Sequence, residues 1–96
     1  MPMGYKRPER RTASDWRYFF ETVERMRQGR WAVHTKCEVC DVTLTVSLAV
    51  IAKAQGGKFS LWNRQPPCSV EGCTGRRYYE AKPPGLFDWI RLAAPD

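Results

Sequence analysis

The pattern of apolar and polar positions divides the chain into a helical first third and a strand-rich remainder. From residue 16 onward, large apolar residues recur at offsets of 0, 3, 4, 7 and 10, which places them on one face of a helix. They are Trp16, Phe19, Phe20, Val23 and Met26. Ser14 or Thr12 can cap the first turn, and Gly29 can end the helix. We expect a single amphipathic helix that packs this face on the core; docking of the face on a partner is the alternative.

A period of two follows the helix and predicts a β-hairpin. Residues 30–36 alternate, with Trp31 and Val33 on one side, and residues 41–46 alternate again. Residues 37–40 then form the tip that joins the two strands.

The middle of the chain carries a second helical pattern. Residues 48–55 predict a helix that a pair of glycines ends, with Leu48, Ile51 and Ala52 facing inward. Because the stretch contains β-branched residues, a strand is the alternative. Residues 58–65 fit either a strand or a helical turn.

The last third contains one predicted strand and one short apolar segment. Residues 76–82 predict the strand, and the prolines that follow it break the chain. Residues 86–92 are too few for an independent helix, yet they are rich in apolar side chains. We expect this segment to cover the first helix; the alternative is a hydrophobic peg for another protein.

Four cysteines add the strongest chemical signal. They form two closely spaced pairs, Cys37 with Cys40 and Cys68 with Cys73, and account for every cysteine in the chain. Two such pairs deliver four thiolates to one tetrahedral ion, with each sulfur about 2.3 Å from zinc. The pattern predicts one structural Zn²⁺, which would help a short chain to fold.

Cysteine pairs with this spacing also have two alternative roles. Two disulfides would suit a secreted domain, and an iron or iron–sulfur site is a further alternative. No apolar secretory signal is visible near the N-terminus, which favours reduced, metal-binding thiols. His34 is the remaining candidate ligand, but four thiolates make it unnecessary, so we interpret it as a strand residue.

Positive charge is concentrated at the start of the chain. The formal net charge is +6, and residues 1–36 hold nine Lys or Arg residues against four Asp or Glu residues. We expect residues 1–13 to form a disordered basic arm that can lie along a nucleic-acid backbone. Its basic side chains are Lys6, Arg7, Arg10 and Arg11. The alternative is a solvated tail with no binding role.

A second basic group follows the last cysteine. Arg76 and Arg77 stand beside Tyr78 and Tyr79 in the predicted strand. Guanidinium groups clamp phosphates and tyrosine rings stack on unpaired bases, so the group is a candidate nucleic-acid contact. The alternative is that one tyrosine faces the core and the arginines offset the negative charge of a four-thiolate site.

The stretch from Trp31 to Tyr79 resembles the small zinc-ribbon proteins of bacteria, in particular short alphaproteobacterial ones. The resemblance rests on a strand, a C-x2-C turn, a short helix ending near glycine, and a second cysteine turn. Here that second turn is C-x4-C, and the N-terminal helix and residues after 82 lie outside the pattern. The resemblance implies a bacterial nucleic-acid binder or an accessory piece of transcription, replication or translation machinery.

Together these observations predict a small α+β zinc-stabilised domain, zinc-ribbon-like, with an N-terminal amphipathic helix. We expect residues 14–92 to form one domain with its ribbon core at 31–82, and residues 93–96 to form a tail. The expected function is non-enzymatic binding of DNA or RNA in the cytoplasm, since no catalytic motif is present. The alternative is a protein-interaction subunit that docks through its aromatic helix and residues 86–92. No segment is long enough to span a membrane, and no small-molecule substrate is expected.

Overall fold

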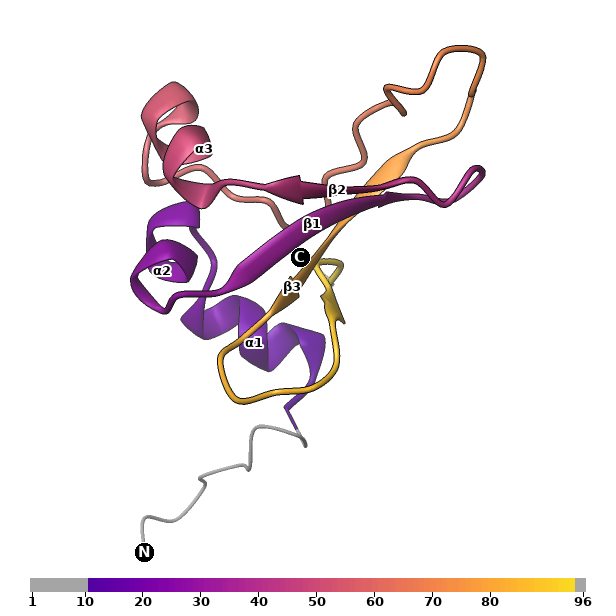
Figure 1. The fold of residues 1–96 in the computed structure, drawn as a ribbon. Coiled ribbons are helices and arrows are strands. Elements are labelled where there is room, and N and C mark those ends of the chain that lie inside the picture. Colours follow the sequence, from indigo (N-terminus) through magenta and orange to yellow (C-terminus); the bar gives the residue numbers. More distant parts are fainter. Residues whose placement is uncertain (1–10, 95–96) are drawn as a thin grey trace, which may run out of the picture.

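Residues 11–94, the part of the chain that the computed structural model describes, form an α+β domain (Figure 1). The helices are α1 (Ala13–Phe19), α2 (Val23–Gln28) and α3 (Leu48–Gln55). The strands are β1 (Ala32–Cys37), β2 (Thr43–Val46), β3 (Arg77–Lys82) and β4 (Ile90–Arg91). None of these helices has the length and apolar character needed to cross a lipid bilayer. The predicted fold class is confirmed: a small α+β domain with a four-cysteine cluster consistent with zinc stabilisation.

The strands form one antiparallel sheet in the order β2-β1-β3-β4. The predicted hairpin is confirmed, since β1 and β2 pair from Val33 opposite Val46 to Lys36 opposite Thr43. On its other side β1 pairs with β3, from Ala32 opposite Lys82 to Cys37 opposite Arg77. The long connection between β2 and β3 therefore returns the second cysteine pair to the end of the sheet that carries the first.

The expected single N-terminal helix is wrong, because the chain breaks it into α1 and α2. Thr12 caps α1 in a reciprocal capping box with Asp15, and Thr22 caps α2 by accepting a hydrogen bond from the Arg25 amide. Two amides of the first turn of α2 donate to backbone carbonyls of the segment that follows α3, Val23 to Phe59 and Glu24 to Gly57. That segment thus satisfies donors that a continuous helix would bond internally.

The break also changes which aromatic residues are buried. Trp16, Val23 and Met26 lie in the core, but Phe19, predicted to face inward, is 51% exposed. Its position follows from the end of α1 at Phe19, where the helical spacing that related it to Val23 stops. Gly29 ends α2 as predicted.

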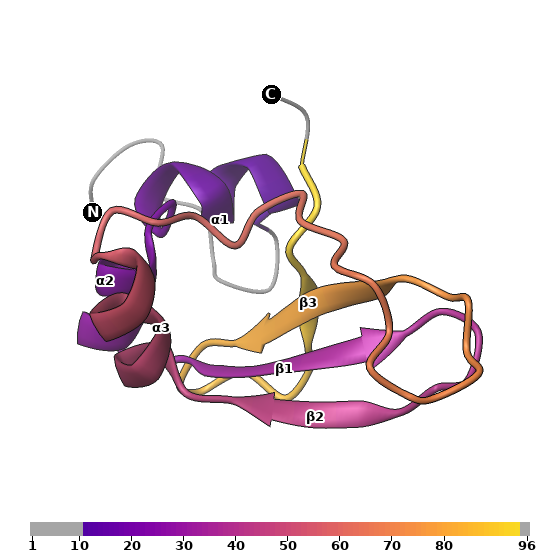
Figure 2. The ribbon, with the colours of Figure 1, turned by 90° about the horizontal axis from the view of Figure 1, so that it is seen from above.

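The apolar core lies where the three helices meet one end of the sheet (Figures 1 and 2). Trp31 packs edge-on against Trp16, with ring centroids 5.5 Å apart, and against Phe20 at 4.5 Å. Residues 58–65 form a turn rather than a strand; they bury Leu61 and Trp62, whose indole Nε1 donates to the Phe20 carbonyl. The core therefore depends on three separate parts of the chain.

The helical interpretation of residues 48–55 is confirmed, and the strand alternative is wrong. Ser47 caps α3 by accepting from the Val50 amide, and Gly56 ends the helix with φ +91°. Leu48 is buried, and Ile51 and Ala52 pack half-buried against the core as predicted. The caps at both ends of α3 therefore favour a helix more strongly than its β-branched residues favour a strand.

Within residues 86–92, Ile90 and Arg91 form β4 and add an edge strand to the sheet, a role that the sequence did not predict. Leu92 is buried and its amide donates to the Tyr79 carbonyl, whereas Phe87 is 96% exposed. Ala94, which we placed in a terminal tail, is also buried. Its amide donates to Asn63 Oδ1, and its carbonyl accepts from Asn63 Nδ2 and Arg17 Nη1. The folded part of the chain thus reaches beyond residue 92.

Candidate metal centre and basic surface

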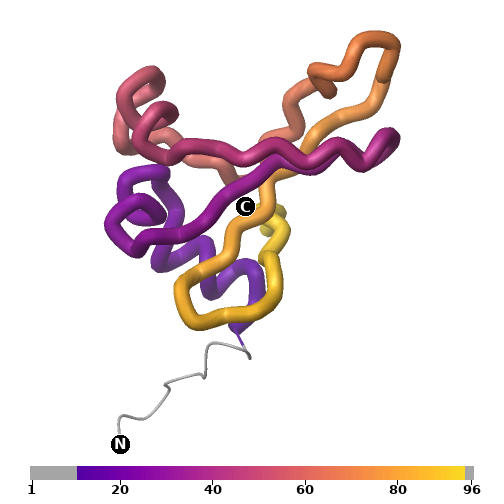
Figure 3. The backbone as a smooth tube through the Cα atoms, in the orientation of Figure 1, coloured from indigo at the N-terminus to yellow at the C-terminus, as the bar shows by residue number. Residues whose placement is uncertain are grey.

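Two loops meet at the end of the sheet opposite the helices (Figures 1 and 3). One is the tip of the β1–β2 hairpin and the other is the loop of residues 68–73, which leads into β3. Backbone hydrogen bonds hold them in place: the Glu38 amide donates to the Arg76 carbonyl, and the Cys68 amide donates to the Gly75 carbonyl. The fold therefore aligns the two cysteine turns through main-chain contacts.

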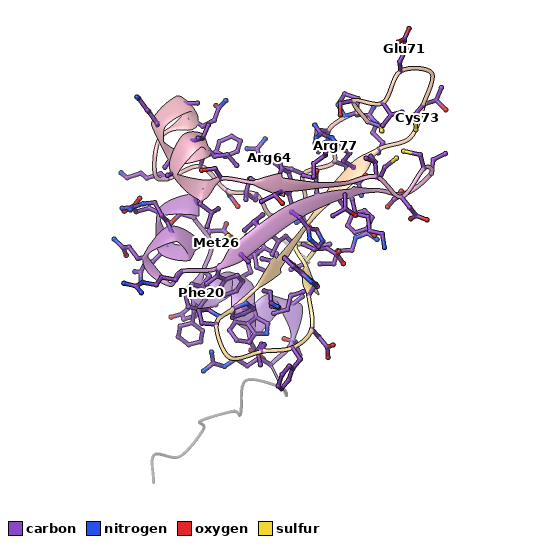
Figure 4. All side chains as sticks on the ribbon, in the orientation of Figure 1. Phe20, Met26, Arg64, Glu71, Cys73 and Arg77 are labelled. Carbon is purple, nitrogen blue, oxygen red and sulfur yellow. The ribbon has the colours of Figure 1, made fainter. Side chains whose placement is uncertain are left out.

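The four predicted cysteines come together between these loops (Figure 4). Their Sγ atoms all lie within 4.8 Å of one another, and the distance is 3.7 Å both from Cys37 to Cys73 and from Cys40 to Cys68. Four thiolates about 2.3 Å from a zinc ion would be ~3.8 Å apart at the corners of a tetrahedron. Disulfide sulfurs are ~2.05 Å apart, so the four cysteines, all free, do not form the alternative pairs. The cluster is able to hold one metal ion.

Backbone amides in both turns point at the sulfurs. The amides of Val39 and Cys40 lie 3.4 and 3.5 Å from Cys37 Sγ. The amides of Val70 and Gly75 lie 3.4 Å from Cys68 Sγ and Cys73 Sγ, respectively. Such donors stabilise negative charge on sulfur, as the ligand sulfurs of a metal site require.

The amides also set the acidity of the thiols. The Cys40 and Val39 amides lower the pKa of Cys37 to about 6. Each of the other three thiols also has an amide that lowers its pKa, but burial and neighbouring thiols outweigh this and raise the pKa of Cys40, Cys68 and Cys73. Cys37 is therefore the most acidic of the four thiols.

Small or permissive residues allow the turns to approach so closely. A Cβ on Gly75 would lie 2.8 Å from Cys37 Sγ and 2.7 Å from Val39 Cγ2. Gly72 adopts φ +81° just before Cys73, and Asp41 adopts φ +60° just after Cys40, a conformation that aspartate tolerates better than most residues. Cysteine spacing alone predicted the ligands, but not the close contact that requires glycine at residue 75.

Comparison of the chain with protein-family models, with curated proteins and with solved structures finds no match. No family is identified. The zinc-ribbon resemblance is supported in one respect: the structure gathers the four cysteines in a cluster, which suggests a zinc-binding site.

The structure places two of the candidate phosphate contacts at the base of the cysteine loop. Arg76 Nη1 donates to the Gln65 carbonyl at 3.2 Å, and Arg77 Nε donates to the Pro67 carbonyl at 3.1 Å. Figure 4 shows Arg77 on the strand that leaves the loop. Neither guanidinium forms an ion pair with a carboxylate between residues 11 and 94. Main-chain carbonyls thus orient both arginines, and no carboxylate of residues 11–94 neutralises their positive charge.

The other candidate contacts are distributed differently. Tyr78 is half-buried beneath Arg91, whose guanidinium carbon lies 4.1 Å from the ring centroid, and Tyr79 packs against the core as the alternative interpretation proposed. Arg11 lies over Trp16 of α1, 4.9 Å from the ring centroid. Lys6, Arg7 and Arg10 lie outside the described residues. The structure therefore does not bring Arg11 to the cysteine end of the sheet.

One face of the sheet carries polar residues that the sequence analysis did not single out. We call it the outer face and define it by residues that share a side in the strand registers. They are His34 and Lys36 of β1, Thr43 and Thr45 of β2, Tyr78, Glu80 and Lys82 of β3, and Arg91 of β4. Alternation in residues 76–82 is a signal for this face, but only the pairing of β1 with β3 shows which residues meet there.

Proposed function

We propose that the four cysteines hold one structural Zn²⁺ and that the chain binds nucleic acid beside this site. Among metals, zinc favours a tetrahedral set of four thiolates, and with four protein ligands it keeps no open position for substrate or water. The proposed role is therefore binding rather than catalysis. Zinc would fix the loop that positions Arg76 and Arg77.

The observation that supports the proposal is the set of hydrogen-bond partners of these two arginines. Each donates to a main-chain carbonyl and not to a carboxylate of the described residues, so the remaining N–H groups and the full positive charge are available. Nearby Lys36 also forms no ion pair with the described residues. Arginines held in this way are suited to phosphate oxygens, and the chain's net charge of +6 favours a polyanion.

The test compares two double variants with equal loss of charge. Arg76→Gln/Arg77→Gln is expected to weaken binding of a labelled oligonucleotide at least tenfold and to reduce the salt dependence, because two phosphate contacts are lost. Lys53→Gln/Lys58→Gln, which changes exposed residues at the helical end, is the matched control and should bind nearly as wild type. Fluorescence anisotropy over a salt series measures both quantities, and zinc content shows that each variant keeps its metal site.

Two results would overturn the proposal. One is a wild-type protein that binds neither DNA nor RNA at low salt. The other is an Arg76→Gln/Arg77→Gln variant that retains its zinc and binds as tightly as the control.

A second candidate function, docking on a protein partner, is favoured by exposed aromatic residues. Tyr18 is 82% exposed and Phe19 is 51% exposed on α1, and their rings lie edge to face with centroids 5.0 Å apart. Among the large apolar side chains of residues 86–92, Phe87 is the most exposed. Tyr18→Ser/Phe19→Ser separates the two candidates, since it should abolish partner binding and leave oligonucleotide binding unchanged.

A further inference from the structure

Trp89 lies over the outer face of the sheet. Its ring centroid is 3.8 Å from that of His34, and the two planes are 33° apart. His34 is held in turn by Glu80, with Nε2 and Oε1 2.7 Å apart. Trp89 is 38% exposed, whereas the other three tryptophans are at most 6% exposed. The chain thus places a single accessible indole on a fixed support.

A cavity of about 380 Å³ opens beside this pair. Trp89 and His34 form part of its wall, Thr45 supplies a hydroxyl, and Arg27 reaches it from α2. The volume is at the lower end of the range for small-molecule sites, ~300–1,000 Å³. An aromatic wall with a few polar groups is suited to a flat heterocycle such as a nucleobase.

The charges around the cavity favour an anionic ligand that continues along the sheet. Lys82 Nζ lies 5.5 Å from the centroid of Trp89, and Lys36 lies toward the cysteine end of the same face. Arg76 precedes Tyr78 by two residues, which places it on the same side of the chain just before β3 begins. Alternate residues of a strand are ~6.7 Å apart, so Arg76 and Lys82 are separated by ~20 Å. Of the carboxylates near this face, Glu80 is hydrogen-bonded to His34 and Glu38 is paired with Arg91. Arg27 is paired with Glu24, whereas Lys36, Lys82 and Arg76 form no ion pair with a carboxylate of the described residues and supply the positive charge that a phosphate would meet.

We infer that the outer face binds single-stranded nucleic acid, with one unpaired base in the cavity against Trp89. The phosphates on either side of that base would run from Lys82 toward Lys36 and Arg76. A base in a duplex is already stacked and paired, so its ring is not available to Trp89. This inference rests on the proposed function and specifies its substrate class.

The experiment uses tryptophan emission as the readout of stacking, because Trp89 is the exposed tryptophan and the other three are buried. Zinc-loaded protein is titrated with a short oligothymidylate and, separately, with a hairpin duplex. We expect the single strand to quench the fluorescence and the duplex to leave it unchanged. Trp89→Leu should lose the quenching and bind the single strand at least about fivefold more weakly, because stacking on one aromatic ring contributes ~1–3 kcal/mol per base.

The control is Phe87→Leu, which removes a neighbouring aromatic ring that is 96% exposed, and it should behave as wild type. If Trp89→Leu lacks the near-ultraviolet circular dichroism of the folded protein, Trp89→Phe and the wild-type quenching decide the question. Binding that depends on Arg76 and Arg77 but shows neither quenching nor any effect of Trp89 overturns this inference and leaves the proposed function standing. A protein that binds neither single strand nor duplex overturns both.

Discussion

At the scale of single residues, Gly75 sets how closely the two cysteine turns approach. Its position lacks room for a methyl group, because the added Cβ would lie 2.8 Å from both Cys37 Sγ and Val39 Cβ. Val39 is 67% exposed and can move, but the sulfur is fixed by its place in the cluster. The contact therefore restricts residue 75 to glycine when the two turns lie this close.

We therefore expect Gly75→Ala to lower metal affinity at least tenfold, which corresponds to about 1.4 kcal/mol. Competition with a chromophoric zinc chelator measures the change. Thr74→Ala, an exposed neighbour in the same loop, is the control and should keep wild-type affinity. Equal affinities for the two variants would show that the loop adapts to the extra methyl group.

Residue identities also show what the sequence could predict of the site. The spacing of the cysteines is a local pattern, so all four ligands were found without the fold. Trp89 and His34 are 55 positions apart, and only the register of β1, β3 and β4 brings them together. Contacts of this kind leave no periodic signal in one sequence, and for that reason the aromatic pair was missed.

At the scale of elements, the observed helices and strands agree with the prediction wherever capping residues and hydrophobic periodicity indicate the same structure. β1, β2, α3 and β3 were predicted because alternation or a capped helical pattern marks each one. The break between α1 and α2 was not predicted, since helical periodicity continues through it. The break depends on the carbonyls of Gly57 and Phe59, which come from a distant part of the chain. Long-range hydrogen bonds outweigh local periodicity here.

The contribution of the Thr22 cap to stability at this break can be measured. Thr22→Ala removes the oxygen that caps α2, and we expect a loss of about 1 kcal/mol in the free energy of unfolding. Thr22→Ser keeps the acceptor and should remain close to wild type. Urea unfolding of the zinc-loaded proteins, followed by circular dichroism, gives both values. If alanine at this position were neutral, the bonds to Gly57 and Phe59 alone would define the break.

At the scale of the whole molecule, the apolar core and the cysteine cluster occupy opposite ends of the sheet (Figure 4). Phe20 and Met26 lie at the helical end, and Cys73 lies in the loop at the other. Of the four cysteines only Cys37 is fully buried. The cysteine end therefore has little apolar burial, and its order depends on bound metal more than that of the helical end.

Acidification should consequently release the metal. Binding requires thiolates; Cys37 has a pKa lowered to about 6, but Cys40, Cys68 and Cys73 have raised pKa values and must lose protons when the ion binds. Affinity should rise with pH and fall more than tenfold between about pH 8 and about pH 6. A chelator competition series over this range measures the slope. A pH-independent affinity would contradict a site built from four thiolates.

The strand order has a consequence for how the protein is made. β1 is central, yet its partner β3 begins forty residues after β1 ends, at Arg77. In a nascent chain the first two thiols are thus synthesised well before the second two. During that interval the central strand has an unprotected edge, which is open to pairing with other chains. Binding of one ion by all four sulfurs would end this exposure, and an occupied site would therefore report that both halves of the chain have met in the register of β1 with β3.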